Sequence, residues 1–118
     1  MAGAFDPGCL FCKIIAGDSP SETVYQDDLV VAFRDRYPKT PTHILIVCRE
    51  HIPTLDYIGE EHSGLMARIV MVASRLARQE GIATNGYRLG VNVGRWGGQA
   101  IYHVHFHLMG GMPLRGEG

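Results

Sequence analysis

The segment His103-Val104-His105-Phe106-His107-Leu108 carries a histidine at every second position, with an apolar residue after each one. On an extended strand, successive side chains point to opposite faces, so the imidazoles share one face and the apolar side chains share the other. Histidine has an unperturbed pKa of about 6.5, which lets it act as nucleophile, base or acid near neutral pH. A single histidine on a strand is ordinarily packed or exposed without a special role, but three on one face indicate a chemical site.

The composition is that of one ordinary globular domain spanning residues 1–118, with a flexible tail expected over residues 1–8. Hydrophobic residues make up 46% of the chain, charged residues 19%, and the formal net charge is −1. This balance gives no reason to expect nucleic acid or an anionic membrane as a partner. No long apolar run or signal-peptide pattern is present, so we expect a cytoplasmic protein whose three cysteines form no disulfide scaffold.

The order of the predicted elements indicates an α+β domain with a mostly antiparallel five-stranded sheet. A short helix is expected over 11–16 and a long helix over 60–80. The apolar surface of the long helix is wider than one stripe, so it can serve both the sheet and a second subunit. We therefore expect a homodimer joined through this helix and the adjoining strand. The predicted strands are 23–26, 29–34, 43–48, 87–92 and 101–109.

A glycine-rich segment, residues 92–99, leads directly into the histidine strand. Glycines let the backbone turn tightly and bring its N–H groups close to an anion. Next to three histidines, this segment predicts a phosphate beside a nucleophilic imidazole. Asn92 and Gln99 offer amide donors at its two ends.

Two other residues each have two interpretations. Asp35 follows a predicted strand and is either a turn residue or a carboxylate that accepts hydrogen bonds from ribose hydroxyls. His43 opens a buried strand and is either a satisfied core histidine or a neighbour of the three histidines.

Cys9 and Cys12 have the spacing of a metal-ligand pair, and a cytoplasmic location favours metal over disulfide. Two further ligands are needed, and His51 and one histidine of the strand are available. From the residues alone, zinc binding stays open.

Together these motifs resemble the histidine triad (HIT) family, specifically its Hint-type branch of purine nucleoside phosphoramidases. The resemblance extends from Leu10 to Gly111 and implies the HIT-like fold. The segments that carry it are Phe11-x-Lys13-Ile14-Ile15, Phe33-x-Asp35-x-x-Pro38, Pro41-Thr42-His43, Gly97-Gly98-Gln99, Tyr102 to Leu108, and Gly110-Gly111.

The resemblance implies an enzyme that hydrolyses purine nucleoside 5′-phosphoramidates at the P–N bond and releases AMP or GMP. In the family, the middle histidine attacks the α-phosphate and forms a covalent nucleotidyl-histidine, which makes His105 the nucleophile here. Imidazole suits this role because it is both a neutral nucleophile and a good leaving group. The implied catalytic residues are His43, His103, His105 and His107. The implied nucleotide-binding residues are Leu10, Phe11, Ile14, Phe33, Asp35, Asn92, Gly98, Gln99, His105 and His107.

The resemblance also bears on the metal. Some bacterial members, and related uridylyltransferases, hold a structural zinc through two cysteines, a histidine after the third strand and the first histidine of the triad. The matching residues here are Cys9, Cys12, His51 and His103. The implied zinc is structural and is not required for the chemistry, while Cys48 is expected to be a buried thiol.

Two features of the sequence depart from the family pattern. Ala100 stands where Hint-type members carry serine, which bears on the preferred leaving amine. Arg36-Tyr37 replaces apolar and small residues beside the base site. Three alternatives stay open: a hydrolase with a catalytic zinc, a non-catalytic nucleotide sensor or scaffold, and a dinucleoside polyphosphate hydrolase.

Overall fold

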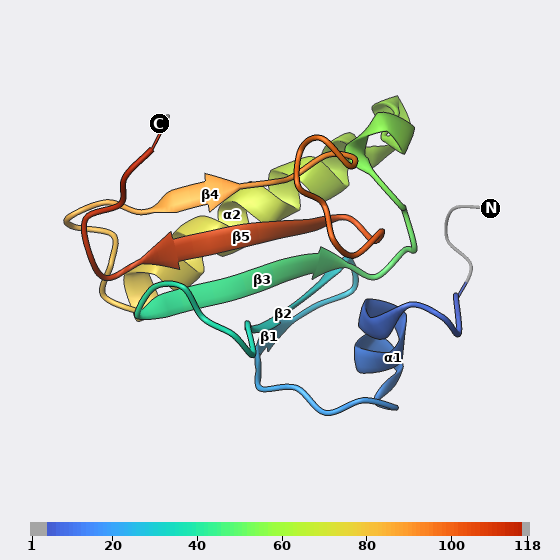
Figure 1. The fold of residues 1–118 in the computed structure, drawn as a ribbon, viewed down its shortest axis with the longest axis horizontal. Coiled ribbons are helices and arrows are strands. Elements are labelled where there is room, and N and C mark those ends of the chain that lie inside the picture. The colour runs from blue at the N-terminus through green and yellow to red at the C-terminus, as the bar shows by residue number, and fades with distance from the viewer. Residues whose placement is uncertain (1–4, 117–118) are drawn as a thin grey trace.

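The computed structural model describes residues 5–116 and is built around a five-stranded antiparallel sheet (Figure 1). The strand order is β1-β2-β3-β5-β4, so β3 lies at the centre and is buried along its whole length. The α+β fold with five antiparallel strands is therefore confirmed. The strands are β1 Thr23–Gln26, β2 Val30–Arg34, β3 Thr42–Cys48, β4 Arg88–Gly90 and β5 His105–Gly110.

Two α-helices accompany the sheet: α1 Leu10–Ala16 and α2 Ser63–Gln79. Two short 3₁₀ helices, Leu55–Tyr57 and Glu60–His62, lead into α2. The predicted long helix over 60–80 is thus correct in kind, but its first turn is a separate 3₁₀ turn. No helix of the described residues is long and apolar enough to cross a membrane.

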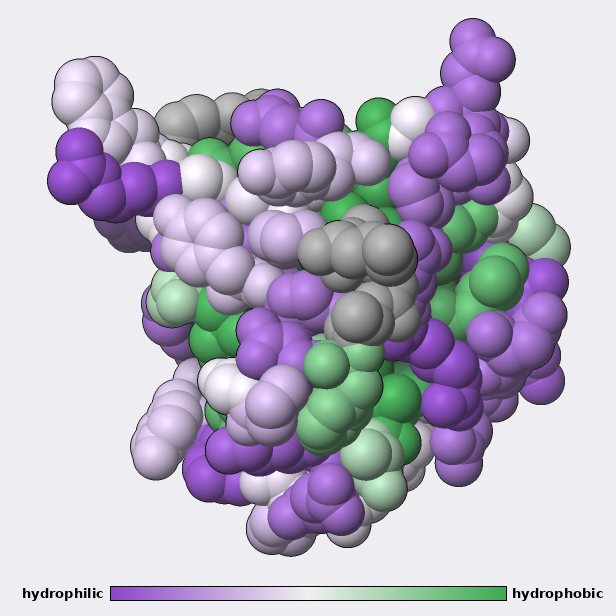
Figure 2. Space-filling model, turned by 90° about the vertical axis from the view of Figure 1, so that its right-hand side faces the viewer, coloured by the Kyte–Doolittle hydropathy of each residue, from purple (hydrophilic) through white to green (hydrophobic). Residues whose placement is uncertain are grey.

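Side-chain alternation along β3 divides the core between the two faces of the sheet. Ile44 and Ile46 pack in a cluster with the inward side of α2, whereas Leu45 and Val47 pack in a second cluster with Phe11 of α1. The helices therefore cover opposite faces, and α2 lies behind the sheet in Figure 1. On the side of the molecule seen in Figure 2, hydrophilic side chains surround separate apolar areas.

The histidine strand differs from its prediction in one important respect. We expected an extended strand over 101–109, but the ladder between β3 and β5 ends at the pair Val47 and His105. Beyond it, the N–H of Val104 donates to the carbonyl of Ile52 at 2.7 Å, and the chain bends at 101–103. His103 is thus outside the strand, because its backbone leaves the ladder and no longer follows strand alternation.

Other strand boundaries were also inexact. The strand predicted over 87–92 is confined to Arg88–Gly90, and the strand predicted over 29–34 begins at Val30. Of the tail expected over residues 1–8, residues 1–4 lie outside the described residues, and residues 5–8 are solvent-exposed.

Candidate active site and metal cluster

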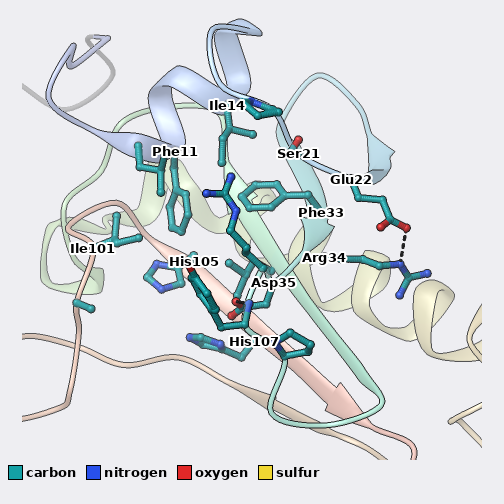
Figure 3. Close-up of a pocket in the computed structure, with 17 residues that line it drawn as sticks. Phe11, Ile14, Ser21, Glu22, Phe33, Arg34, Asp35, Ile101, His105 and His107 are labelled. Carbon is teal, nitrogen blue, oxygen red and sulfur yellow. Dashed lines mark hydrogen bonds and ion pairs between the residues drawn. The ribbon is translucent and has the colours of Figure 1, made fainter.

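A cavity of about 630 Å³ opens beside the α1 face of the sheet. Phe11 and Ile14 of α1 and Phe33 of β2 lie at one side of it, and His105 and His107 of β5 lie at the other (Figure 3). Phe11 contacts two rings of the cavity edge to face, with ring centroids 5.5 Å from Phe33 and 4.9 Å from His105. The cavity thus joins an apolar region to a pair of imidazoles.

Most of the residues predicted to bind a nucleotide line this cavity. They are Leu10, Phe11, Ile14, Phe33, Asp35, His105 and His107. Several other residues line the cavity without having been predicted, including Ser21, Glu22, Arg34 and Ile101. Ser21 and Glu22 belong to the connection between α1 and β1, and no local motif marks them as neighbours of the histidines.

Three residues predicted to contact the nucleotide, Asn92, Gly98 and Gln99, do not line the cavity. The side chain of Gln99 is buried and engaged with backbone groups. Its Oε1 accepts the N–H of Gly94 at 2.9 Å, and its Nε2 donates to the carbonyls of Pro53 at 2.7 Å and Ile101 at 3.1 Å. Gln99 therefore holds the glycine-rich loop in place.

The hydrogen bonds of His105 determine which of its ring nitrogens is free. Its Nδ1 lies 2.7 Å from the carbonyl oxygen of His103. Because a carbonyl oxygen only accepts, Nδ1 carries the proton and Nε2 keeps its lone pair. Nε2 of His105 is therefore the unprotonated ring nitrogen at the cavity.

Hydrogen bonds also fix the tautomers of His43 and His107. The backbone N–H of Lys39 donates to Nδ1 of His43 at 3.1 Å, which places the His43 proton on Nε2. That Nε2 lies 2.9 Å from Nδ1 of His107, so His107 accepts there and carries its own proton on Nε2. His107 thus offers an N–H donor beside the lone pair of His105. Of the two interpretations of His43, the second is correct: His43 is a neighbour of the histidines of β5.

Burial keeps these histidines neutral. Burial lowers the pKa of His105, and burial together with the neighbouring rings of His105 and His43 lowers the pKa of His107 to about 4. Burial also lowers the pKa of His43. Near neutral pH His105 therefore keeps its free Nε2 lone pair, and His107 keeps its Nε2–H donor.

Asp35 lies at the end of β2, where it is partly exposed to the cavity. Its Oδ1 accepts the N–H of Tyr37 at 2.9 Å, and its Oδ2 lies 3.4 Å from Nε2 of His43. Asp35 is therefore a turn residue, as one interpretation held, and its carboxylate also borders the cavity, as the other requires.

Cys9, Cys12, His51 and His103 form a compact cluster next to the cavity, with ligand atoms all within 4.8 Å of one another. The Sγ atom of Cys12 lies 3.3 Å from Nδ1 of His51, and the two Nδ1 atoms of His51 and His103 are 3.1 Å apart. With zinc bonds of about 2.0–2.3 Å, neighbouring ligands of a tetrahedron are about 3.3–3.8 Å apart. The donor set and its spacing fit a tetrahedral zinc.

Groups outside the cluster orient two of its histidines. Nε2 of His103 donates to the carbonyl of Cys48 at 2.6 Å, which leaves the Nδ1 lone pair directed toward the cysteines. Nε2 of His51 lies 3.8 Å from the carboxylate of Asp6. Such carbonyl and carboxylate partners are typical of metal-binding histidines.

Asp35, His43 and His107 form a second group with the composition of a metal site. Here, however, the two histidine nitrogens are 2.9 Å apart and are joined by the proton of His43. A hydrogen bond accounts for their proximity, so His43 and His107 act as a proton-linked pair.

The chain resembles known proteins over most of its length. A family model described as HIT domain matches residues 16–114. The purine nucleoside phosphoramidase of Escherichia coli (strain K12) is 53% identical over 105 residues, which cover 89% of this chain and 88% of that protein.

Two solved structures are informative. A HIT family hydrolase from Legionella pneumophila superposes with a TM-score of 0.90 at 44% identity, covering 92% of this chain and 96% of that one. A zinc-bound histidine triad family protein from Mycobacterium smegmatis superposes with a TM-score of 0.75 at 28% identity, covering 87% and 74%.

Proposed function

The chain belongs to the HIT domain family, and from that premise we propose that it hydrolyses purine nucleoside 5′-phosphoramidates at the P–N bond. The family predicted from the sequence is thereby confirmed. The observation that carries the proposal is the tautomer of His105, whose Nε2 lone pair is left free at the cavity. The names of the relatives, a hydrolase and a phosphoramidase, support an enzyme rather than a sensor.

Binding places the three parts of the nucleotide in three parts of the cavity. The apolar region formed by Phe11, Ile14 and Phe33 receives the base, and the carboxylate of Asp35 accepts hydrogen bonds from the ribose. The α-phosphate then lies between the two imidazoles, where the Nε2–H of His107 donates to a phosphate oxygen.

The reaction proceeds in two displacements. Nε2 of His105 attacks the phosphorus, the P–N bond breaks with its electron pair on nitrogen, and the leaving nitrogen takes a proton from solvent to depart as an amine. Positive charge then develops on the ring of His105, and the carbonyl of His103 stabilises it through the Nδ1–H. Water attacks the phosphorus and gives a proton to solvent, the bond to Nε2 breaks to restore the neutral imidazole, and the nucleoside monophosphate, AMP or GMP, is released.

The experiment that tests this function follows AMP formation from adenosine 5′-phosphoramidate by chromatography. Wild type should turn over, whereas His105→Ala should lose on the order of 10³-fold or more of the rate while still binding AMP. His62→Gln is the matched control, because His62 lies outside the cavity and should leave turnover unchanged. Full activity in His105→Ala would refute the nucleophile, and AMP binding without turnover by either protein would favour a nucleotide sensor.

We also propose that Cys9, Cys12, His51 and His103 hold one structural zinc ion. The fit of the cluster to a tetrahedron and the zinc-bound relative support this. When bound, zinc would tie the start of α1 to the segments that follow β3 and precede β5. Metal analysis of the purified protein should give about one zinc per chain for wild type and Cys48→Ser, and none for Cys12→Ser. A wild-type protein that takes up no zinc after refolding with the metal would contradict the proposal.

We further propose that the chain forms a homodimer through α2 and an adjoining strand. Val70 and Met71 on α2 are 57% and 66% exposed, although large apolar side chains are usually buried. Light scattering should give twice the chain mass for wild type and the single chain mass for the double variant Val70→Lys, Met71→Lys. A wild-type protein that is monomeric at high concentration would refute the dimer.

A further inference from the structure

Arg36 lines the cavity as a cation without an acidic partner. The other lining arginine, Arg34, is held by Glu80 through two bonds of 2.8 and 2.9 Å and by Glu22 at 3.0 Å. Within residues 5–116, by contrast, Arg36 forms neither a hydrogen bond nor an ion pair. Its guanidinium donors are therefore available to a ligand.

A short turn holds Arg36 at the cavity. The N–H of Tyr37 donates to the carboxylate of Asp35 at 2.9 Å, which bends the chain directly after β2. Asp35, Arg36 and Tyr37 consequently all line the cavity, and the side chain of Arg36 is solvent-exposed. A ligand can thus reach Arg36 without any rearrangement of the core.

The apolar part of the cavity can contact the face of a base but cannot read its edge. Phe11, Ile14 and Phe33 have no polar side-chain atoms, so edge recognition depends on the polar lining residues. Ser21 is paired with Thr23 at 3.1 Å, and Glu22 is paired with Arg34. Arg36 is therefore the lining side chain with several unengaged donors.

We propose that Arg36 is a specificity-determining residue that favours guanine over adenine; the inference rests on the proposed nucleotide-hydrolase function. Guanine presents two acceptors, O6 and N7, on one edge, and the planar guanidinium matches such a pair with two parallel N–H donors. Adenine presents N7 together with an amino group, which is a donor. One N–H of the guanidinium would then face this donor instead of an acceptor, and one of the two hydrogen bonds would be lost. The preferred substrates are thus 6-oxopurine nucleoside 5′-phosphoramidates.

The experiment measures equilibrium binding of GMP, IMP and AMP by calorimetry to wild type, Arg36→Met and Arg36→Lys. IMP carries the same O6 and N7 as GMP but lacks the 2-amino group. In Arg36→Met, the affinity for GMP and for IMP should fall roughly 5- to 150-fold while that for AMP stays nearly constant. Arg36→Lys should recover only part of the loss, because an ammonium lacks the planar pair of donors.

Arg78→Met serves as the control, because it removes the same charge from an exposed position of α2 that does not line the cavity. It should leave all three affinities unchanged. An equal loss for GMP, IMP and AMP in Arg36→Met would overturn the inference, since it would place the guanidinium on the phosphate or over the face of the base. Unchanged binding of IMP, or of all three nucleotides, would overturn it as well. If wild type binds none of the three, the proposed function fails together with the inference.

Discussion

At the scale of single residues, Gln99 shows how a family motif and a structural role can coincide. The resemblance assigns its amide to the phosphate, yet all three of its hydrogen bonds go to backbone groups of Pro53, Gly94 and Ile101. A buried amide that satisfies buried backbone groups contributes to stability, because its removal leaves those groups without partners.

We therefore expect Gln99→Ala to lower the free energy of unfolding by about 2–4 kcal/mol, as several buried backbone groups lose their partner together. Chemical denaturation of wild type and Gln99→Ala measures this change. Gln79→Ala, at an exposed position of α2, is the control and should change stability by less than about 0.5 kcal/mol. Unchanged stability with weakened nucleotide binding would instead support the phosphate contact.

The low pKa of His107 makes stability depend on pH. In the unfolded chain His107 takes up a proton near its ordinary pKa of 6.5, whereas in the folded protein burial and the neighbouring histidines delay protonation to about pH 4. Between these values the unfolded state binds more protons, so stability falls as the pH is lowered from about 6.5 to about 4. The contribution of His107 is at most about 3–4 kcal/mol, because each pKa unit corresponds to about 1.4 kcal/mol.

Denaturant midpoints measured at several pH values between 7 and 4 check this expectation. The variant His107→Asn removes the titrating group and should have a shallower decline than wild type over that range. Gln79→Ala, which changes no titratable group and lies at an exposed position of α2, should retain the slope of wild type. Equal slopes in wild type and His107→Asn would show that His107 titrates alike in both states.

At the scale of elements, the sequence correctly predicted the features that depend on local periodicity, such as which face of a strand a side chain occupies. The alternation in the histidine segment placed His105 and His107 on one face of β5 and Leu108 on the other; the two histidines line the cavity, and Leu108 packs in the cluster with α2. Alternation could not predict that β5 begins only at His105. That boundary depends on the bond from Val104 to Ile52, whose position is determined by tertiary packing rather than by neighbouring residues.

The lining of the cavity, likewise, was predictable only in part. Motif residues of α1, β2 and β5 do line the cavity, but the connection carrying Ser21 and Glu22 reaches it only through the three-dimensional arrangement. Asn92 and Gly98 show the converse case, since both were predicted from a glycine-rich loop next to the histidines in sequence and neither lines the cavity. Short sequence separation is a poor guide to contact when the chain bends, as it does at 101–103.

The packing of α2 on the sheet leads to a further prediction. Ile69 is fully buried in the cluster that joins α2 to β3 and β5. Ile69→Ala removes buried methyl and methylene groups and leaves a cavity, so it should lower the free energy of unfolding by about 2–5 kcal/mol. Chemical denaturation again provides the measurement, and a loss below about 0.5 kcal/mol, typical of surface positions, would contradict this packing.

At the scale of the whole molecule, the cluster of cysteines and histidines links parts of the chain that are far apart in sequence. Cys9 and Cys12 belong to the start of α1, His51 follows β3, and His103 precedes β5. His103 has a further connection, because its carbonyl accepts the Nδ1–H of the proposed nucleophile His105 at 2.7 Å. The segment that would ligate the metal therefore also orients the imidazole at the cavity.

Removal of zinc should consequently loosen the molecule well beyond the cluster. Chelation should lower the midpoint of thermal unfolding of the zinc-loaded protein by on the order of 5–10 °C, since a ligand at 100 times its dissociation constant stabilises by about 2.7 kcal/mol. Hydrogen exchange should accelerate at the N–H of Val104, which bonds Ile52 between the two histidine-bearing segments. In Cys12→Ser the chelator should have no effect on either quantity. A wild-type midpoint that the chelator leaves unchanged, in protein shown to have lost its zinc, would mean that hydrogen bonds and packing alone hold these segments together.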